Sequence, residues 1–132
     1  MAVGIGAFGA HGLEDFLVGR EIDPETIAKR TDQFDVGVRY HMFHVVALFA
    51  LATIPYGSPT ARWVTAALFV AGTILFSGSL YVLVLMNNPW LGRITPIGGV
   101  IWIVAWLSLI VIAQKRKTES WSSGETWSND PK

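Results

Sequence analysis

The sequence predicts an all-α fold: an integral membrane helix bundle with three full spans plus a short N-terminal helix. Of the 132 residues, 52% are hydrophobic and only 15% are charged, and the mean hydropathy is +0.43. No charged residue occurs between Val64 and Leu85, and a second apolar run covers Ile97 to Ala113. Each run has the length of a membrane-spanning helix, about 17–25 residues.

The composition also excludes several classes of function. The formal net charge is +0, so no long-range field attracts nucleic acid, which we do not expect as a partner. The chain contains no cysteine. Disulfides, thiolate zinc sites, iron–sulfur clusters and thiol catalysis are therefore excluded.

The first element is a short, small-residue helix. Residues Ala2 to Leu13 carry no Asp, Glu, Lys or Arg, but the stretch is too short for a full span. Two interpretations fit the stretch: a re-entrant or interfacial segment, or the second half of a helix whose beginning lies upstream of Met1. Ala2, Gly6 and Ala10 recur every four residues, a ridge that allows a neighbouring helix to approach closely.

A polar and amphipathic segment at residues 14–38 leads into the next helix. Asp23 followed by Pro24 is a typical helix start, with an N-cap and a proline at the first helical position. A helical face then continues without a break, and it consists of Ile27, Thr31, Phe34, Val38, His41 and Val45. The pattern predicts one long helix over Pro24–Ile54, embedded in the membrane over its last two-thirds.

The two remaining spans follow after turns. Pro55 to Pro59 is a turn by composition, Val64 to Leu85 is the next span, and Asn87-Asn88-Pro89 ends it. Thr95 and Pro96 begin the last helix, and we expect the cluster Lys115-Arg116-Lys117 to stop it. The predicted bundle therefore covers residues 1–117.

A polar tail occupies residues 118–132 and carries Trp121 and Trp127. Tryptophan combines a large apolar ring with one hydrogen-bond donor, so both side chains are candidate contacts with other membrane protein subunits. The basic cluster beside the last span favours a cytoplasmic C-terminus. We expect a multi-pass protein of the bacterial inner membrane, or of an equivalent membrane.

The three histidines lie in or near membrane segments, at His11, His41 and His44. Imidazole is the commonest metal ligand, so a metal or haem site is one interpretation. The three-residue spacing of His41 and His44 supplies only two ligands from one helix face, and a metal site needs more. We favour histidines that hydrogen-bond across helices, and we predict no metal and no cofactor.

A second polar group lies in the uncharged run. Thr73, Ser77 and Tyr81 are four residues apart and share a helix face, whereas Ser79 lies off it. A serine nucleophile needs a base within reach, and the string Ser77-Gly78-Ser79 lacks the glycine spacing of a nucleophile elbow. We therefore predict no catalytic residue. The candidate polar intramembrane cluster consists of His11, His41, His44, Thr73, Ser77 and Tyr81.

Three strings carry a family resemblance. They are Gly6–Leu13 (GAFGAHGL), Leu75–Tyr81 (LFSGSLY) and Leu91–Gly99 (LGRITPIGG), with Tyr40-His41 and His44 between them. Together they resemble the small membrane-protein family called domain of unknown function 423, which includes the transmembrane protein 256 relatives of animal cells. The resemblance implies a four-helix membrane fold in which the first string ends the first span. It implies no activity, cofactor or catalytic residue.

The function that these observations favour is non-catalytic. Small-residue ridges, few ionisable groups in the spans and the tryptophan-bearing tail indicate an accessory or structural subunit of a larger membrane complex, in contact with lipid. The alternative is binding or transport of a small molecule, lipid or ion between the helices. A metal or haem site at His11, His41 and His44 is the second alternative.

Overall fold

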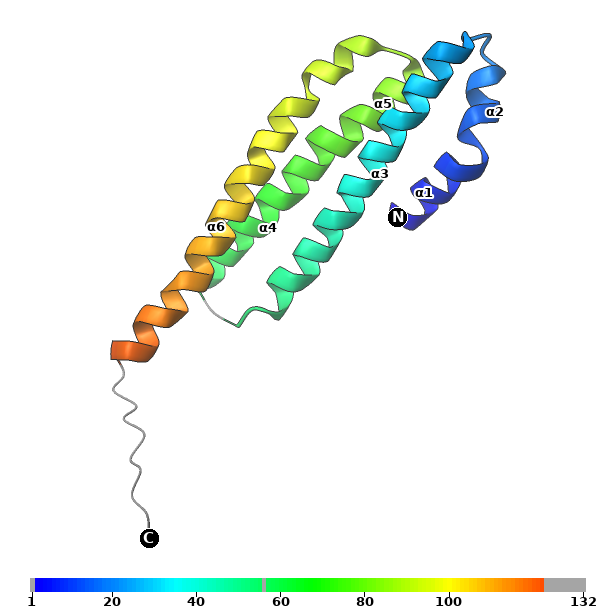
Figure 1. The fold of residues 1–132 in the computed structure, drawn as a ribbon. Helices are drawn as coiled ribbons and strands as arrows, with labels where there is room; N and C mark the ends of the chain where they lie inside the picture. The colour runs from blue at the N-terminus through cyan, green and yellow to red at the C-terminus, as the bar shows by residue number, and fades with distance from the viewer. Residues whose placement is uncertain (1, 56, 123–132) are drawn as a thin grey trace.

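The computed structural model describes the backbone of residues 2–55 and 57–122 and the side chains up to Ile112. Every regular element in this part of the chain is helical. Three of the helical segments, Pro24–Thr53, Pro59–Met86 and Pro89–Ile112, are long and apolar enough to cross a membrane. They lie side by side, and a short N-terminal segment packs against one end (Figure 1). The predicted bundle of three spans plus a short helix is confirmed.

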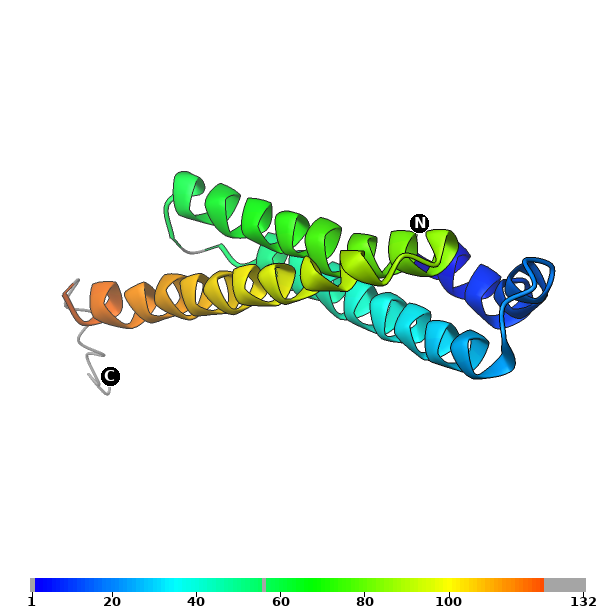
Figure 2. The same ribbon diagram turned by 90° about the horizontal axis from the view of Figure 1, so that it is seen from above.

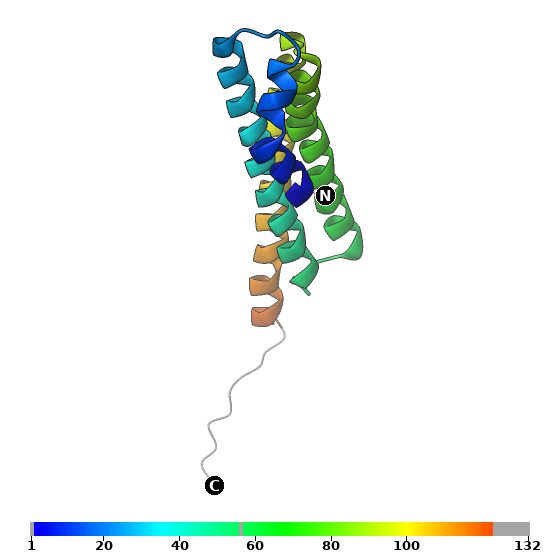
Figure 3. The same ribbon diagram turned by 90° about the vertical axis from the view of Figure 1, so that its right-hand side faces the viewer.

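The N-terminal segment consists of helix α1 (Ala2–His11) and helix α2 (Leu13–Val18). Figure 3 shows this segment in front of the long helices, over the upper part of that face only. Glycines of α1 allow the close approach, because a Cβ at Gly6 would lie 3.2 Å from Val38 and one at Gly9 would lie 2.8 Å from Phe34. Ala10 is exposed. The close-packed side therefore follows the 3.6-residue period through Gly9, rather than the predicted strict interval of four.

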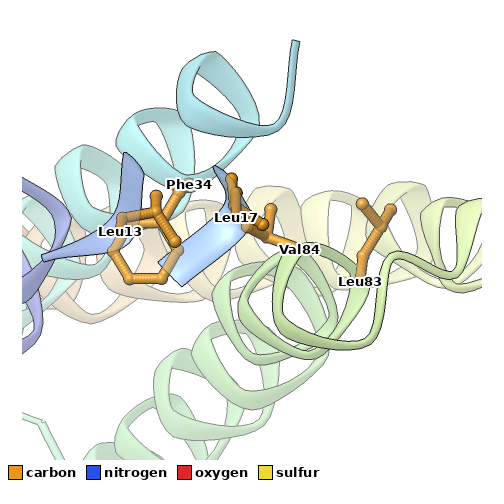
Figure 4. Close-up of a cluster of buried hydrophobic side chains, with 5 residues drawn as sticks. All are labelled: Leu13, Leu17, Phe34, Leu83 and Val84. Carbon is orange, nitrogen blue, oxygen red and sulfur yellow. The ribbon is translucent and has the colours of Figure 1, made fainter. Parts of the chain in front are cut away.

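Helix α3 (Pro24–Thr53) is the long helix that the sequence predicts. Asp23 caps it, since its carboxylate accepts a hydrogen bond from the Thr26 amide at 2.9 Å. Two apolar clusters fix α3 against the rest of the bundle. The upper cluster joins α2, α3 and α5 through Leu13, Leu17, Phe34, Leu83 and Val84 (Figure 4). The lower cluster joins α3, α4 and α6 through Ala47, Leu51, Phe69, Trp102 and Ala105.

The next span is built from three consecutive pieces. Helix α4 (Pro59–Thr73) begins at the N-cap Ser58 and continues into the π-helix η1 (Ile74–Gly78) and helix α5 (Ser79–Met86). The span ends at Asn87, which adopts the left-handed conformation with φ +49°. The π turn is a structural feature that the sequence did not predict. Such turns inside α-helices are rare and occur frequently at functional sites.

The last span begins with a 3₁₀ turn, η2 (Pro89–Arg93), and continues as helix α6 (Thr95–Ser122). The prediction that Lys115-Arg116-Lys117 stops the helix was wrong, because the backbone remains helical to Ser122. Lysine, arginine and glutamate are good helix formers, so a basic cluster ends a membrane span without ending its helix. Trp127 and the side chain of Trp121 lie outside what the structure describes.

Two arginines hold the polar end of the bundle, where α2, α3 and α5 meet. Arg20 donates a hydrogen bond to the carbonyl of Leu85, one of the free carbonyls at the end of α5. Arg30 is buried; its Nε donates to Asn87 at 2.8 Å and its Nη1 donates to Gln33 at 2.8 Å. These bonds fix the end of the α4–η1–α5 span against the beginning of α3. Figure 2, seen from above, shows this end at the right and the long helices crossing one another obliquely to the left of it.

Candidate functional site

The α4–η1–α5 helix is called the second span here, and α6 the third. Small residues bring these two spans into close contact along one face, which we call the seam. A Cβ added at Gly98 of α6 would lie 2.5 Å from the backbone nitrogen of Phe76, and one added at Gly72 of α4 would overlap the indole of Trp102. In lipid, where helices gain little from the hydrophobic effect, this kind of close approach drives association. The seam is defined by Thr65, Gly72, Ser79, Thr95, Gly98, Trp102 and Ser108.

Every seam hydroxyl has a hydrogen-bond partner. Thr65 and Ser108 lie 2.9 Å apart across the two helices, and Ser79 and Thr95 are joined at the same distance. The indole nitrogen of Trp102 donates to the carbonyl of Phe69 at 3.3 Å. An unpaired hydroxyl in a nonpolar environment costs about 1–3 kcal/mol in proteins, so these pairs remove a penalty as well as join helices.

His44 belongs to the seam side of α3. Its ring stacks on Trp102 with ring centroids 3.6 Å apart and an interplanar angle of 4°. Its Nδ1 lies 2.7 Å from the carbonyl of Tyr40, and because a carbonyl only accepts, Nδ1 is the donor. The side chain is 5% exposed. His44 therefore acts as a packed aromatic ring with one satisfied donor.

The opposite side of the second span is open, and it contains a cavity that we call the central groove. The groove has a volume of about 400 Å³ and lies between α1, α3 and the α4–η1–α5 span. It is lined by Ile5, His41, Val45, Leu48, Val70, Thr73, Ile74, Ser77, Gly78 and Tyr81. The lining is mostly apolar with four polar side chains, as is common for pockets that bind small molecules.

The four polar side chains of the groove differ in their hydrogen bonding. Thr73 donates back to the carbonyl of Phe69 at 2.9 Å, and the hydroxyl of Tyr81 lies 3.3 Å from Nδ1 of His41. Ser77 is 1% exposed, and its hydroxyl oxygen has no hydrogen-bond partner within the described residues. A helical serine in lipid usually bonds a carbonyl of the preceding turn. Ser77 lies in the π turn and does not.

The structure brings together four of the six residues of the predicted polar cluster: His41, Thr73, Ser77 and Tyr81. It separates the other two, since His11 is exposed on α1 and His44 faces Trp102 in the seam. Consequently the three histidines do not converge on one site. Across residues 2–55 and 57–112, no group of three His, Cys, Asp or Glu side chains is placed to hold a metal ion. No hydrogen bond joins Ser77 to either His41 or His44 among these residues.

Sequence reasoning missed two parts of the arrangement. The apolar walls of the groove, from Ile5, Val45, Leu48 and Val70, carry no chemical signal that distinguishes them from other lipid-facing residues. The pairs Thr65–Ser108 and Ser79–Thr95 also depend on the rotation of α6 against α4, which tertiary packing decides. The available signal for these pairs was that each of the two predicted spans carries hydroxyl side chains.

Comparisons with known proteins give a family and no reaction. The family model described as "Protein of unknown function (DUF423)" matches residues 5–99. The UPF0382 membrane protein YwdK of Bacillus subtilis is 44% identical over an alignment of 121 residues, and the alignment covers 87% of this chain and 88% of the relative. A UPF0382 membrane protein of Haemophilus influenzae is 34% identical over 88% of this chain and 86% of its own length.

The similarity extends to a eukaryote. The UPF0382 membrane protein C1782.12c of Schizosaccharomyces pombe is 35% identical over 84% of this chain and 90% of its own length. No solved structure matches the chain. The relatives are thus similar over most of their length, and their names give a membrane address without an activity.

Proposed function

The chain belongs to the DUF423 family of membrane proteins, and from that premise we propose that it is a non-catalytic accessory subunit of a larger membrane complex. The observation that carries the proposal is the outward face of α6. Its side chains Val100, Ile103, Val104 and Leu107 are 47–60% exposed, and they form a continuous apolar strip along the third span. This surface suits the flank of another membrane helix as well as lipid.

The use of the polar groups supports a non-catalytic role. The hydroxyls of the seam pair with one another or with carbonyls, and His44 is stacked and hydrogen-bonded. Catalysis by Ser77 would require a base within hydrogen-bond reach, and no such bond is formed within the described residues. Polar groups that only hold helices together are typical of a structural membrane protein.

Two further parts of the proposal come from the sequence. Trp121 and Trp127 follow the third span and are the proposed contacts with a partner outside the hydrocarbon core. The basic cluster Lys115-Arg116-Lys117 supports the proposal that this end of the chain lies in the cytoplasm, by the positive-inside rule. The membrane would be a bacterial inner membrane or an equivalent one.

Site-specific photocrosslinking in native membranes tests the proposal. A photoreactive amino acid at Val104 on the exposed α6 strip should give one adduct of defined mass to another membrane protein. The matched control is Val82, which is 40% exposed on α5, away from that strip. The subunit proposal fails if Val104 yields no protein adduct and the gently extracted chain elutes alone.

A second candidate function is the binding of a small molecule between helices. The specific observation in its favour is the hydroxyl of Ser77, which is buried beside a groove of about 400 Å³ and lacks a partner within the described residues. Buried polar groups without partners are rare in proteins, and a bound molecule is one physical reason for them. This candidate and the accessory role are compatible, because the groove and the α6 strip lie on different helices.

A further inference from the structure

We propose that a transmembrane helix of a partner protein packs on the side of the bundle where α3 faces α6, and that a hydroxyl or amide group of that helix donates a hydrogen bond to Nε2 of His44. The inference rests on the proposed accessory role and deepens it by giving the chemistry of the partner. It combines three observations: a free acceptor on His44, the depth of this atom in the membrane, and the aromatic residues around it.

His44 presents a hydrogen-bond acceptor that no described residue engages. Its Nδ1 donates to the carbonyl of Tyr40 at 2.7 Å, so in the neutral ring Nε2 carries only a lone pair. Among the buried and half-buried side chains of residues 2–55 and 57–112, the hydroxyl oxygen of Ser77 is the one polar atom that is both fully enclosed and unbonded. Nε2 is unbonded but not enclosed, so it belongs to the 5% of His44 that is exposed. A donor from outside the chain can therefore reach it.

The free acceptor lies deep in the hydrocarbon core. His44 stacks on Trp102, whose indole occupies the space that a Cβ at Gly72 would fill. Gly72 is about 12 Å along the helix from Val64 and about 20 Å from Leu85, the two ends of the uncharged run. In a hydrocarbon core about 30 Å thick, headgroups and water do not reach this depth. Acyl chains carry no donor, so lipid alone leaves Nε2 without a hydrogen bond, which is unfavourable for a polar group.

The surface around His44 has the composition of a protein interface. Tyr40 and Phe43 on α3 and Trp106 on α6 are 42%, 58% and 43% exposed. The ring of Trp106 lies 6.2 Å from that of His44. Aromatic residues are enriched where proteins meet. Helix α1 does not cover this surface, because α1 and α6 lie on opposite sides of α3 and the second span (Figures 1 and 3).

A helix with a polar side chain at midspan is the occupant that fits the acceptor. Membrane helices associate by close packing and by hydrogen bonds from Ser, Thr, Asn and Gln side chains. Ile103 of the exposed α6 strip is three residues from Trp106, so the proposed subunit interface adjoins this surface. A second copy of the chain brings no free Ser or Thr to this depth. Every such hydroxyl between Val64 and Ser108 is hydrogen-bonded or, at Ser77, enclosed.

The test is a competition for the partner in native membranes, with p-benzoylphenylalanine in place of Phe43. Wild-type and variant chains with different tags are expressed in equal amounts and in excess of the partner, so that the ratio of their adducts gives the ratio of their affinities. His44→Phe retains a ring that can stack on Trp102 but lacks Nε2, and its adduct should be about threefold weaker, the average effect of one hydrogen bond in a membrane. His44→Gln keeps an acceptor and should compete nearly as well as wild type. The attached peptide should come from a transmembrane segment with Ser, Thr, Asn or Gln close to the crosslink.

The matched control is p-benzoylphenylalanine at Phe49, which is 70% exposed and lies about 120° around α3 from Phe43. It should not give the partner adduct, and an equal adduct there would overturn the inference. Equal adducts from wild type and His44→Phe overturn it too, as does an adduct from Phe43 to a second copy or to lipid alone. If His44→Phe does not insert, His44→Met gives the same comparison.

Failure of this inference is distinguishable from failure of the accessory role. A protein adduct from Val104 on the α6 strip, with none from Phe43, retains the subunit and refutes the donor to His44. The absence of protein adducts from both positions refutes both.

Discussion

Ser77 and Ser79 are two residues apart in the same span, and their surroundings differ completely. Ser79 faces the seam, where its hydroxyl donates to a carbonyl and pairs with Thr95 at 2.9 Å. Ser77 lies beside the central groove, is also buried, and has no partner among the described residues. Burial alone therefore does not reveal the role of a polar residue in lipid; whether its hydrogen bonds are satisfied does.

The geometry of the span explains the contrast. Two residues correspond to about 200° of rotation in an α-helix, so the two serines point to opposite sides. On one side Gly72 and Gly98 allow α6 to lie in close contact with the second span. On the other side, the packing of α1 and α3 leaves the central groove open. The seam is a close-packed surface and the groove is an open one. Each of the following predictions compares the two.

The largest effect is expected for a methyl group added to the seam. Gly98→Ala places a Cβ 2.5 Å from the backbone of Phe76, which forces the helices apart and should lower the free energy of unfolding by about 3 kcal/mol. Gly78→Ala in the groove has no atom within 4 Å and should be neutral or stabilising by up to about 1 kcal/mol. Unfolding in mixed detergent–SDS micelles measures both. Equal losses would show that the groove is as tightly packed as the seam.

A smaller loss is expected at His44. His44→Ala removes a ring stacked at 3.6 Å on Trp102 together with its hydrogen bond to Tyr40, and we expect a loss of about 2 kcal/mol. The matched control is His11→Ala, an exposed position where the change should stay within about 0.5 kcal/mol. If the two variants are equally stable, the stacked arrangement of His44 is contradicted.

A double-mutant cycle isolates one hydroxyl pair of the seam. Thr65→Val and Ser108→Ala remove the two partners of the 2.9 Å bond, and their coupling energy should be about 0.6 kcal/mol, the average for such bonds in membranes. The control cycle combines Thr65→Val in the seam with Ser77→Ala beside the groove. The changes in the free energy of unfolding of these two variants should be additive. Additivity in the first cycle would mean that the seam hydroxyls do not interact.

The smallest effect concerns the cap of α3, outside the membrane. The hydrogen bond from the Thr26 amide lowers the pKa of Asp23 below its ordinary value of 3.8. A lowered carboxyl pKa stabilises the fold above the ordinary pKa, and this stabilisation disappears as the pH falls through the native value. The protection factor of the Thr26 amide, which is its intrinsic exchange rate divided by the observed rate, should therefore stay constant from neutral pH down to about 4 and fall below it. Asp23→Ala should remove that step, and a wild-type step at higher pH would contradict the assignment.

The fold was largely predictable because its signals are local. Uncharged runs locate the second and third spans, and Asp23-Pro24 and Asn87 mark helix ends within a few residues. The end of α6 was predicted wrongly, since a basic cluster marks the edge of lipid and does not break a helix. Hydropathy and capping therefore predict spans more securely than they predict the full length of a helix.

The candidate site was predictable only where one helix supplies it. The interval of four placed Thr73, Ser77 and Tyr81 on one face, and the structure places all three along the groove together with His41. Sequence intervals do not determine how one helix is rotated against another. They therefore could not predict that His44 packs on Trp102 while His41 lines the groove. Nor could they predict the π turn or the pairing of Ser79 with Thr95.

The most direct test of the contrast between the seam and the groove is the stability of Ser77→Ala and Ser79→Ala in the same ligand-free micelles. Ser77→Ala removes a buried hydroxyl that has no hydrogen bond. It should therefore leave the free energy of unfolding unchanged or raise it by about 1 kcal/mol. Ser79→Ala strands the hydroxyl of Thr95 and should lower it by about 1 kcal/mol. A loss for Ser77→Ala as large as that for Ser79→Ala would contradict the account, because it would show that Ser77 already has a partner within the bundle.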